Sequence, residues 1–92
     1  MISPLAYVDP KAEIGNNVTI HPFAYIDKNV VIGDNCEIFP YASVLAGTTM
    51  GKNNRVFHGA ILGAEPQDFR YKGEATHLSI GDNNMIRLSL IH

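Results

Sequence analysis

The chain has 92 residues, of which 46% are hydrophobic and 17% charged, and its formal net charge is -2. This length makes one small domain at most, and a domain of this size is only marginally stable alone. The charge balance provides no cationic field for nucleic acid or an anionic membrane surface, and the apolar content excludes a disordered chain. A single cysteine excludes an internal disulfide, and no apolar run approaches a membrane span, so we expect a cytoplasmic protein.

An aliphatic residue recurs at every sixth position of the first two thirds of the chain. Neither an α-helix nor a heptad coiled coil produces this period. A small or compact residue follows four places after each of these positions, except at Asn54. The alternation of bulky and small residues predicts short strands, joined by turns, around a narrow core. The aliphatic positions are Ile2, Val8, Ile14, Ile20, Ile26, Ile32, Ile38, Val44, Met50, Val56 and Leu62.

A longer period is superimposed on the hexads. The motif Ile/Met-Gly-x-Asn occurs at residues 14–17, 32–35, 50–53 and 80–83, so its intervals are 18, 18 and 30. Gly and Asn tolerate positive φ, which predicts that one corner in three is a tight left-handed turn. Four prolines share one slot of the hexad, where a corner does not need their missing N–H. They are Pro4, Pro10, Pro22 and Pro40.

These periods predict an all-β fold, a triangular parallel β-helix with 18 residues per coil and about four and a half coils. The long interval predicts that one coil carries an inserted loop at about 64–75. Residues 1–92 then form a single β-helix domain. We expect this domain to be truncated, because the chain stops within the apolar run 88–92 and leaves an open strand edge without a polar cap.

The predicted loop carries the polar residues that are best suited to binding a ligand. Gln67 and Asp68 suit hydrogen bonds to sugar hydroxyls, and Arg70 and Lys72 suit a diphosphate. Long excursions from a repeat scaffold are often binding elements. The alternative is a solvated loop that only packs its aromatic residues on the coil.

Residues 64–76 (AEPQDFRYKGEAT) and 80–87 (IGDNNMIR) resemble the UDP-N-acetylglucosamine O-acyltransferase family of lipid A biosynthesis. The resemblance implies a left-handed β-helix and a homotrimer with active sites between subunits. It further implies transfer of a 3-hydroxyacyl chain from acyl carrier protein to the 3-hydroxyl of UDP-N-acetylglucosamine. Gln67, Asp68 and Arg70 match substrate-binding positions, with Arg70 where the family carries a lysine. No cofactor or metal is implied.

The same resemblance places the family's catalytic histidine in coils farther along than His92, so no residue of this chain is assigned as catalytic. We expect His21, His58, His77 and His92 to be surface or packing residues. His21 and His58 are expected on different parts of the coil surface, without a nearby partner in sequence to orient them. Cys36 occupies a small inward slot and is expected to be buried and inert.

Two functional hypotheses follow from these observations. In the first, the chain is the N-terminal part of the acyltransferase, without turnover of its own. In the second, it is a non-catalytic scaffold or trimerisation module that keeps the coil and lacks the base. The histidine spacing does not fit a β-helical zinc enzyme, and the threonines form no ice-binding ladder.

Overall fold

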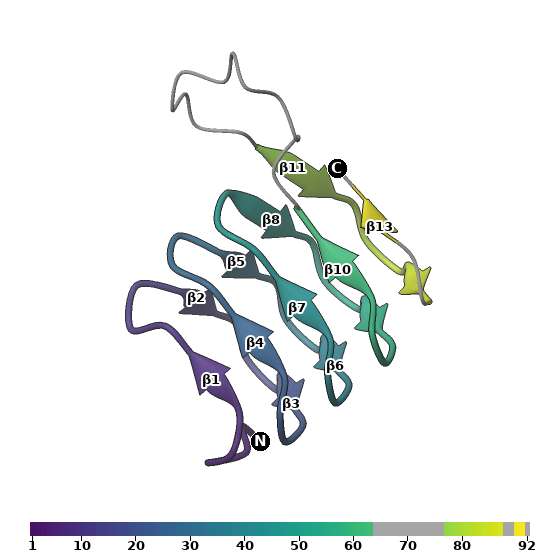
Figure 1. Cartoon of the computed structure of the whole chain (residues 1–92). Coiled ribbons are helices and arrows are strands. Elements are labelled where there is room, and N and C mark those ends of the chain that lie inside the picture. Colours follow the sequence, from purple (N-terminus) through teal and green to yellow (C-terminus); the bar gives the residue numbers. More distant parts are fainter. Residues whose placement is uncertain (64–76, 88–89, 92) are drawn as a thin grey trace.

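The computed structural model describes residues 1–63, 77–87 and 90–91, the last two through their backbone alone. Every regular element in this part of the chain is a short β-strand (Figure 1). The strands are β1 (Tyr7–Val8), β2 (Glu13–Ile14), β3 (Thr19–Ile20), β4 (Tyr25–Ile26), β5 (Val31–Ile32), β6 (Glu37–Ile38), β7 (Ser43–Val44), β8 (Thr48–Met50), β9 (Arg55–Val56), β10 (Ile61–Leu62), β11 (Leu78–Ile80), β12 (Met85–Ile86) and β13 (Leu90–Ile91).

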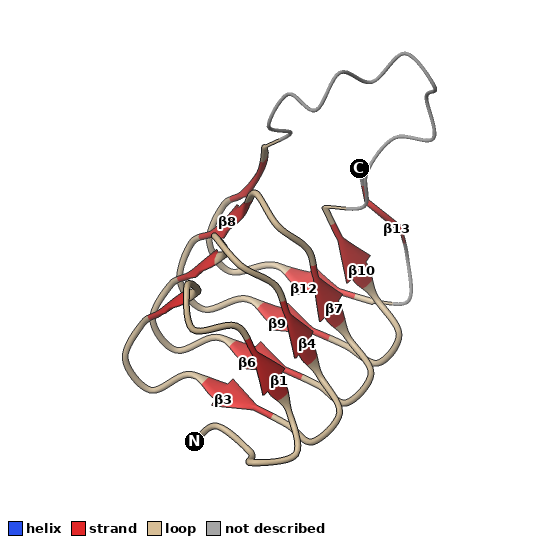
Figure 2. Cartoon of the chain, turned by 60° about the vertical axis from the view of Figure 1, so that its left-hand side comes forward, coloured by secondary structure: helices blue, strands red, loops and turns tan. Residues whose placement is uncertain are grey.

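The strands form three parallel sheets, ordered β1-β4-β7-β10-β13, β2-β5-β8-β11 and β3-β6-β9-β12. Each strand therefore pairs with the strand one coil above it, and Figure 2 shows the coils stacked along one axis. Ile14 pairs with Ile32 and Ile32 with Met50, as an 18-residue coil requires. Met50 then pairs with Ile80, which confirms that the register resumes after the long interval. The fold is the predicted left-handed parallel β-helix; the predicted loop at 64–75 lies outside the described residues.

The inward positions are those that the hexad period predicts. Ile20, Ile26 and Ile38 have no solvent-exposed surface, whereas Ile2 in the first coil is 46% exposed. Burying one side chain of this size stabilises the folded state by about 1.5–3 kcal/mol. Cys36 is also buried, as predicted, and its Sγ donates to the carbonyl oxygen of Gly51 at 3.2 Å. Desolvation raises the pKa of this thiol, which keeps it protonated and inert.

The three corners of the triangle are named here by their place along the chain. The first corner, at residues 3–5, 21–23, 39–41 and 57–59, precedes sheet β1-β4-β7-β10-β13. The second, at 9–11, 27–29 and 45–47, precedes sheet β2-β5-β8-β11. The third, at 15–17, 33–35, 51–53 and 81–83, carries the Gly-x-Asn motif and precedes sheet β3-β6-β9-β12.

Positive φ occurs at all three corners, so the prediction that only one corner in three is left-handed was wrong. The first corner adopts this conformation with aromatic residues, although left-handed φ is unfavourable for bulky side chains. Apart from Gly63, the positive-φ residues are Asn17, Asn35, Asn53 and Asn83 at the third corner, Asn29 and Gly47 at the second, and Phe23, Tyr41 and Gly59 at the first.

Three of the four glycines of the Gly-x-Asn motif, at residues 15, 33 and 51, serve close packing between coils and not positive φ, which corrects their predicted role. Gly15, Gly33 and Gly51 are absent from the positive-φ positions. A Cβ atom built on Gly33 lies 2.5 Å from the carbonyl carbon and oxygen of Gly51 in the coil above. Both contacts are backbone atoms that cannot rotate away, so the coils approach too closely here for any side chain.

We predict that Gly33→Ala lowers the free energy of unfolding by about 1–3 kcal/mol, because the added methyl group pushes two coils apart. Gly81→Ala is the matched control, since a Cβ there meets nothing within 4 Å and we expect a change of less than about 0.5 kcal/mol. Urea unfolding followed by circular dichroism measures both. Equal losses in the two variants would show that coil contact is not the reason for the glycine.

Candidate functional site

The three predicted substrate-binding residues, Gln67, Asp68 and Arg70, lie outside the described residues, so their predicted contacts remain untested. The structure describes the two points between which they lie. The described chain stops after Gly63, which follows β10, and resumes at His77, directly before β11. Figure 1 shows the two flanking strands, β10 and β11, toward the same end of the β-helix.

Both of these points pack against the uppermost described turn of the second corner. The Leu78 N–H donates to the carbonyl oxygen of Gly47 at 3.1 Å, and Leu78 pairs in register with Thr48. Gly63 has φ of 83°, and a Cβ there would collide with the Thr48 hydroxyl. Gly63 therefore needs to be glycine both for its conformation and for its contact. Ladder pairing and close packing thus fix both points against residues 47–48.

Asn54, the exception in the small inward column, holds the returning coil in place. Its side chain is fully buried. Its Nδ2 donates to the carbonyl oxygens of Gly51 at 3.0 Å and Gly81 at 2.7 Å, and its Oδ1 accepts from the Asn84 N–H at 2.8 Å. Two of these three hydrogen bonds join Asn54 to the coil that follows the 30-residue interval of the motif. The sequence signal was present, as a polar residue in an apolar column, but its role was missed.

We predict that Asn54→Ala lowers the free energy of unfolding by about 2–4 kcal/mol, because backbone groups of Gly81 and Asn84 lose their partner and a cavity forms. Hydrogen exchange should accelerate most at Asn84 and in β11, the strand that follows the predicted substrate loop. Asn84→Ala is the control, because its exposed side chain makes one long bond to the Asp82 carbonyl oxygen. Uniform acceleration across all coils would contradict a local clamp.

The second corner carries a carboxylate fixed by two hydrogen bonds in the first coil. The Lys11 N–H donates to Asp9 Oδ1 at 2.8 Å, and the Tyr7 hydroxyl donates to Oδ2 at 2.9 Å. These bonds, the Lys11 N–H first, lower the pKa of Asp9 below its ordinary 3.8, and the shared bond raises the pKa of Tyr7. Asp9 therefore stays ionised and stabilises the turn in the folded state.

A group with a lowered folded-state pKa stabilises the protein above its unfolded pKa and loses that contribution as the pH falls through the folded value. We therefore predict that the acid side of the stability profile, below the ordinary pKa of 3.8, becomes shallower in Asp9→Asn. Thermal unfolding at a series of pH values measures this difference. Glu13→Gln, which removes an exposed carboxylate from β2, is the control; the same flattening in both variants would contradict the assignment to Asp9.

His21 and His58 lie against the same ring, which corrects the expectation that they occupy different parts of the coil surface. The His21 ring stacks on Phe39 with centroids 5.1 Å apart, and the His58 ring lies 5.5 Å from Phe39. His21 has no orienting partner nearby in sequence, as expected, but it has one in space: Glu37 Oε2 lies 2.8 Å from His21 Nε2. Because 16 residues separate this pair, only the coil period brings it together.

Two arginines complete this cluster beside the first corner. The Arg55 guanidinium lies 5.4 Å from the Phe39 centroid and 5.3 Å from that of Phe57, and its Nε is 3.4 Å from Glu37 Oε1. The Arg87 guanidinium lies 4.7 Å from the Phe57 centroid. These distances are typical of cation–π contacts. The cluster holds the His21 ring against Phe39 and within hydrogen-bond distance of Glu37, an environment that argues against a free general base.

The other histidines contribute no assembled site within the part of the chain that the structure describes. His77 is exposed beside β11, and the side chain of His92 is not among those described. No three His, Cys, Asp or Glu side chains among the described residues converge as metal ligands. The described residues also contain no helix with the length and hydropathy needed to cross a membrane.

Comparison with known proteins identifies the relatives of this β-helix. An acyl-acyl-carrier-protein–UDP-N-acetylglucosamine O-acyltransferase of Janthinobacterium sp. (strain Marseille) is 59% identical over 87 residues, which cover 95% of this chain and 33% of that protein. The crystal structure of LpxA, a UDP-N-acetylglucosamine acyltransferase from Bacteroides fragilis 9343, matches with a TM-score of 0.93 at 55% identity, over 99% of this chain and 36% of the other. No protein-family model matches the chain.

A more distant solved structure shows the same fold. UDP-N-acetylglucosamine O-acyltransferase (LpxA) from Moraxella catarrhalis RH4 is 36% identical and still gives a TM-score of 0.93, again over 99% of this chain and 36% of the other. The 18-residue coils place the protein in the class of hexapeptide-repeat β-helices. Within that class the chain belongs to the UDP-N-acetylglucosamine O-acyltransferases, and it spans about a third of the length of the curated relatives it matches.

Proposed function

We propose that this chain is the N-terminal β-helix portion of an acyl-carrier-protein-dependent UDP-N-acetylglucosamine O-acyltransferase that acts in the cytoplasm in the first step of lipid A biosynthesis. The observation that carries the proposal is the 59% identity over 95% of the chain with a protein named for this activity. The fold match at a TM-score of 0.93 supports it. The acyl donor is a 3-hydroxyacyl chain on acyl carrier protein, and the acceptor is the 3-hydroxyl of UDP-N-acetylglucosamine.

The proposed reaction joins the sugar oxygen to the acyl carbon. The hydroxyl oxygen attacks the thioester carbonyl, a general base takes the hydroxyl proton, and the carbon–sulfur bond breaks as the carrier thiolate leaves and is protonated. In this proposal Gln67 and Asp68 hold the glucosamine, with Asp68 near the reacting hydroxyl, and Arg70 supplies a cation to the substrate. Neither His21, which lies against Phe39 and Glu37, nor the exposed His58 is assigned the role of base in this proposal, and this chain is assigned none.

The proposal also includes a homotrimer in which substrate sites lie between subunits.

Two findings favour a substrate-binding role for the predicted loop over a purely solvated one. The register of the coil continues across the loop, from Met50 to Ile80, so the fold itself does not use the extra residues. In addition, Asn54 and Thr48 give the returning coil and both ends of the segment defined positions, which a binding loop requires.

The test is a titration of the chain with UDP-N-acetylglucosamine, followed by amide chemical shifts, alongside an acyl-transfer assay with 3-hydroxyacyl carrier protein. We expect binding that Asp68→Ala and Gln67→Ala weaken at least about tenfold, the effect of losing a hydrogen bond to a charged or polar partner. Glu13→Ala removes an exposed carboxylate from β2, in the first coil, and should leave binding unchanged.

The transfer assay separates the proposed enzyme portion from a non-catalytic scaffold. We expect the chain alone to bind the sugar nucleotide without acylating it, because the proposal gives it no base. Acylated product that disappears in Asp68→Ala would show that the chain supplies its own base. A folded, self-associating chain that does not bind UDP-N-acetylglucosamine would reject the substrate loop and favour the scaffold.

A further inference from the structure

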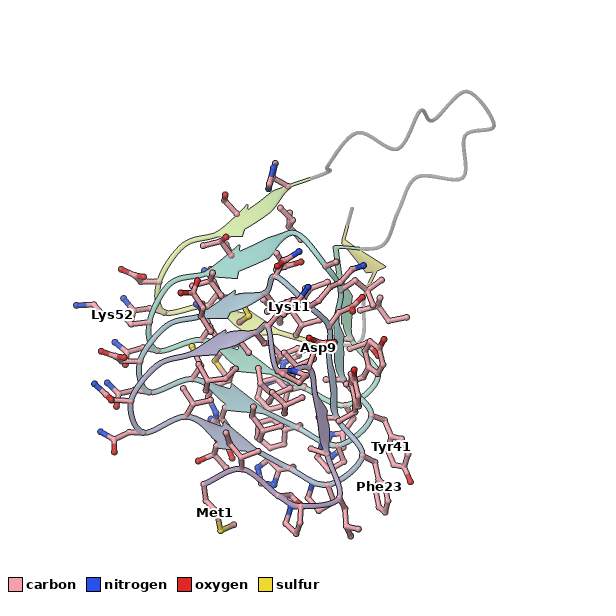
Figure 3. The ribbon with its side chains drawn as sticks, turned by 90° about the vertical axis from the view of Figure 1, so that its left-hand side faces the viewer. Met1, Asp9, Lys11, Phe23, Tyr41 and Lys52 are labelled. Carbon is pink, nitrogen blue, oxygen red and sulfur yellow. The ribbon has the colours of Figure 1, made fainter. Side chains whose placement is uncertain are left out.

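The two kinds of basic side chain occupy different parts of the coil. The described lysines lie at the second and third corners, whereas Arg55 begins β9 and Arg87 directly follows β12, on the sheet that leads into the first corner. Figure 3 shows one of these lysines, Lys52, at a different corner from Phe23 and Tyr41. Among the described residues, arginine therefore occurs only where the coil also presents aromatic rings to it.

One ring, Phe57, holds both guanidinium groups in place. Arg55 Cζ lies 5.3 Å and Arg87 Cζ 4.7 Å from its centroid, so the two cations are no farther apart than the sum of these distances. Phe39, in the coil below, stacks on Phe57 at 4.7 Å and gives Arg55 a second ring. Stacking orients a guanidinium through its face, while its five N–H donors point outward in its plane. Both groups are therefore oriented before any ligand arrives, with more donors than one neighbour can use.

The charges around these rings favour an anionic ligand. Among the described residues one carboxylate, Glu37, contacts the cluster, and it is shared: Oε2 lies 2.8 Å from His21 Nε2, and Oε1 lies 3.4 Å from Arg55 Nε. The other described Asp and Glu side chains belong to β2 or to the second and third corners. Two like charges beside one ring repel each other, and an anion that binds between them relieves this repulsion.

We propose that Arg55 and Arg87, stacked on Phe57, form a binding site for a phosphate group. A phosphate group carries a charge of about −1.5 to −2 at pH 7 and three acceptor oxygens, which match two guanidinium groups, whereas a carboxylate offers one charge. Arginine also binds phosphate through two parallel hydrogen bonds. His58, exposed and 5.5 Å from the Phe39 centroid, adds an imidazole at the rim. The site consists of described residues alone and does not depend on the predicted substrate loop.

Inorganic phosphate is the first probe, and amide chemical shifts of residues 55–58 and 85–87 follow its binding. We expect saturable shifts there, and R55Q/R87Q should weaken binding at least about tenfold because charge-assisted hydrogen bonds are lost. Lys28→Gln is the matched control: it removes an exposed cation from the second corner, the corner that does not border sheet β3-β6-β9-β12, and should leave binding unchanged. An equal loss in both proteins would show an effect of net charge alone and overturn the site.

Glu37 provides a variant that should gain affinity. Its carboxylate competes with a phosphate group for Arg55, from a distance of 3.4 Å between Oε1 and Nε. Glu37→Gln should therefore strengthen phosphate binding about two- to fivefold, which corresponds to the loss of an exposed ion pair. Glu13→Gln, which removes an exposed carboxylate from β2, should change nothing. Unchanged or weaker binding in Glu37→Gln would overturn the assignment of Arg55 to the site.

Two further probes, UDP and acetate, identify the source of the phosphate group and its class. A site for free phosphate makes R55Q/R87Q weaken the binding of inorganic phosphate alone, and a site for a nucleotide diphosphate makes it weaken that of UDP as well; either result supports the proposal. Acetate that binds as tightly as inorganic phosphate would overturn the phosphate class.

Circular dichroism checks that each variant is folded. If R55Q/R87Q does not fold, Arg87→Lys keeps the charge but replaces the planar guanidinium, and unchanged phosphate binding in Arg87→Lys would overturn the site. The predicted loop is tested separately, through the effect of Asp68→Ala on UDP-N-acetylglucosamine binding. The failure of either proposal therefore leaves the other standing.

Discussion

The register of one coil on the next is the constraint on which the rest of this structure depends. Most strands contain only two residues, too few to be stable alone or in a hairpin. Each becomes a strand because the coil above and the coil below supply its backbone partners, as when Ile32 pairs with both Ile14 and Met50. A slip of one residue would turn Ile32 outward and Val31 inward. The six-residue period is therefore imposed by the core, and every other feature adapts to it.

The inward columns could be predicted from the sequence because a narrow triangular core leaves few alternatives. Ile20, Ile38 and Val56 recur at intervals of 18 in the sequence, and each pairs with the next in the structure. The sequence period therefore predicts these contacts directly. The corners were harder to predict. A glycine in this motif is compatible both with positive φ and with close packing against the next coil. Only the structure shows that Gly33 is needed for close packing.

The histidines show a second limit of local sequence reasoning. His21 has no obvious partner among its neighbours in the chain, yet Glu37 and Phe39 contact it from the next coil. Adding the coil period to each residue number would have found Phe39, which lies 18 places further on.

The predicted site residues depend on a different kind of information. Gln67, Asp68 and Arg70 stand outside the repeat, so no periodic argument places their side chains, and their assignment rests on their polar chemistry and on the resemblance.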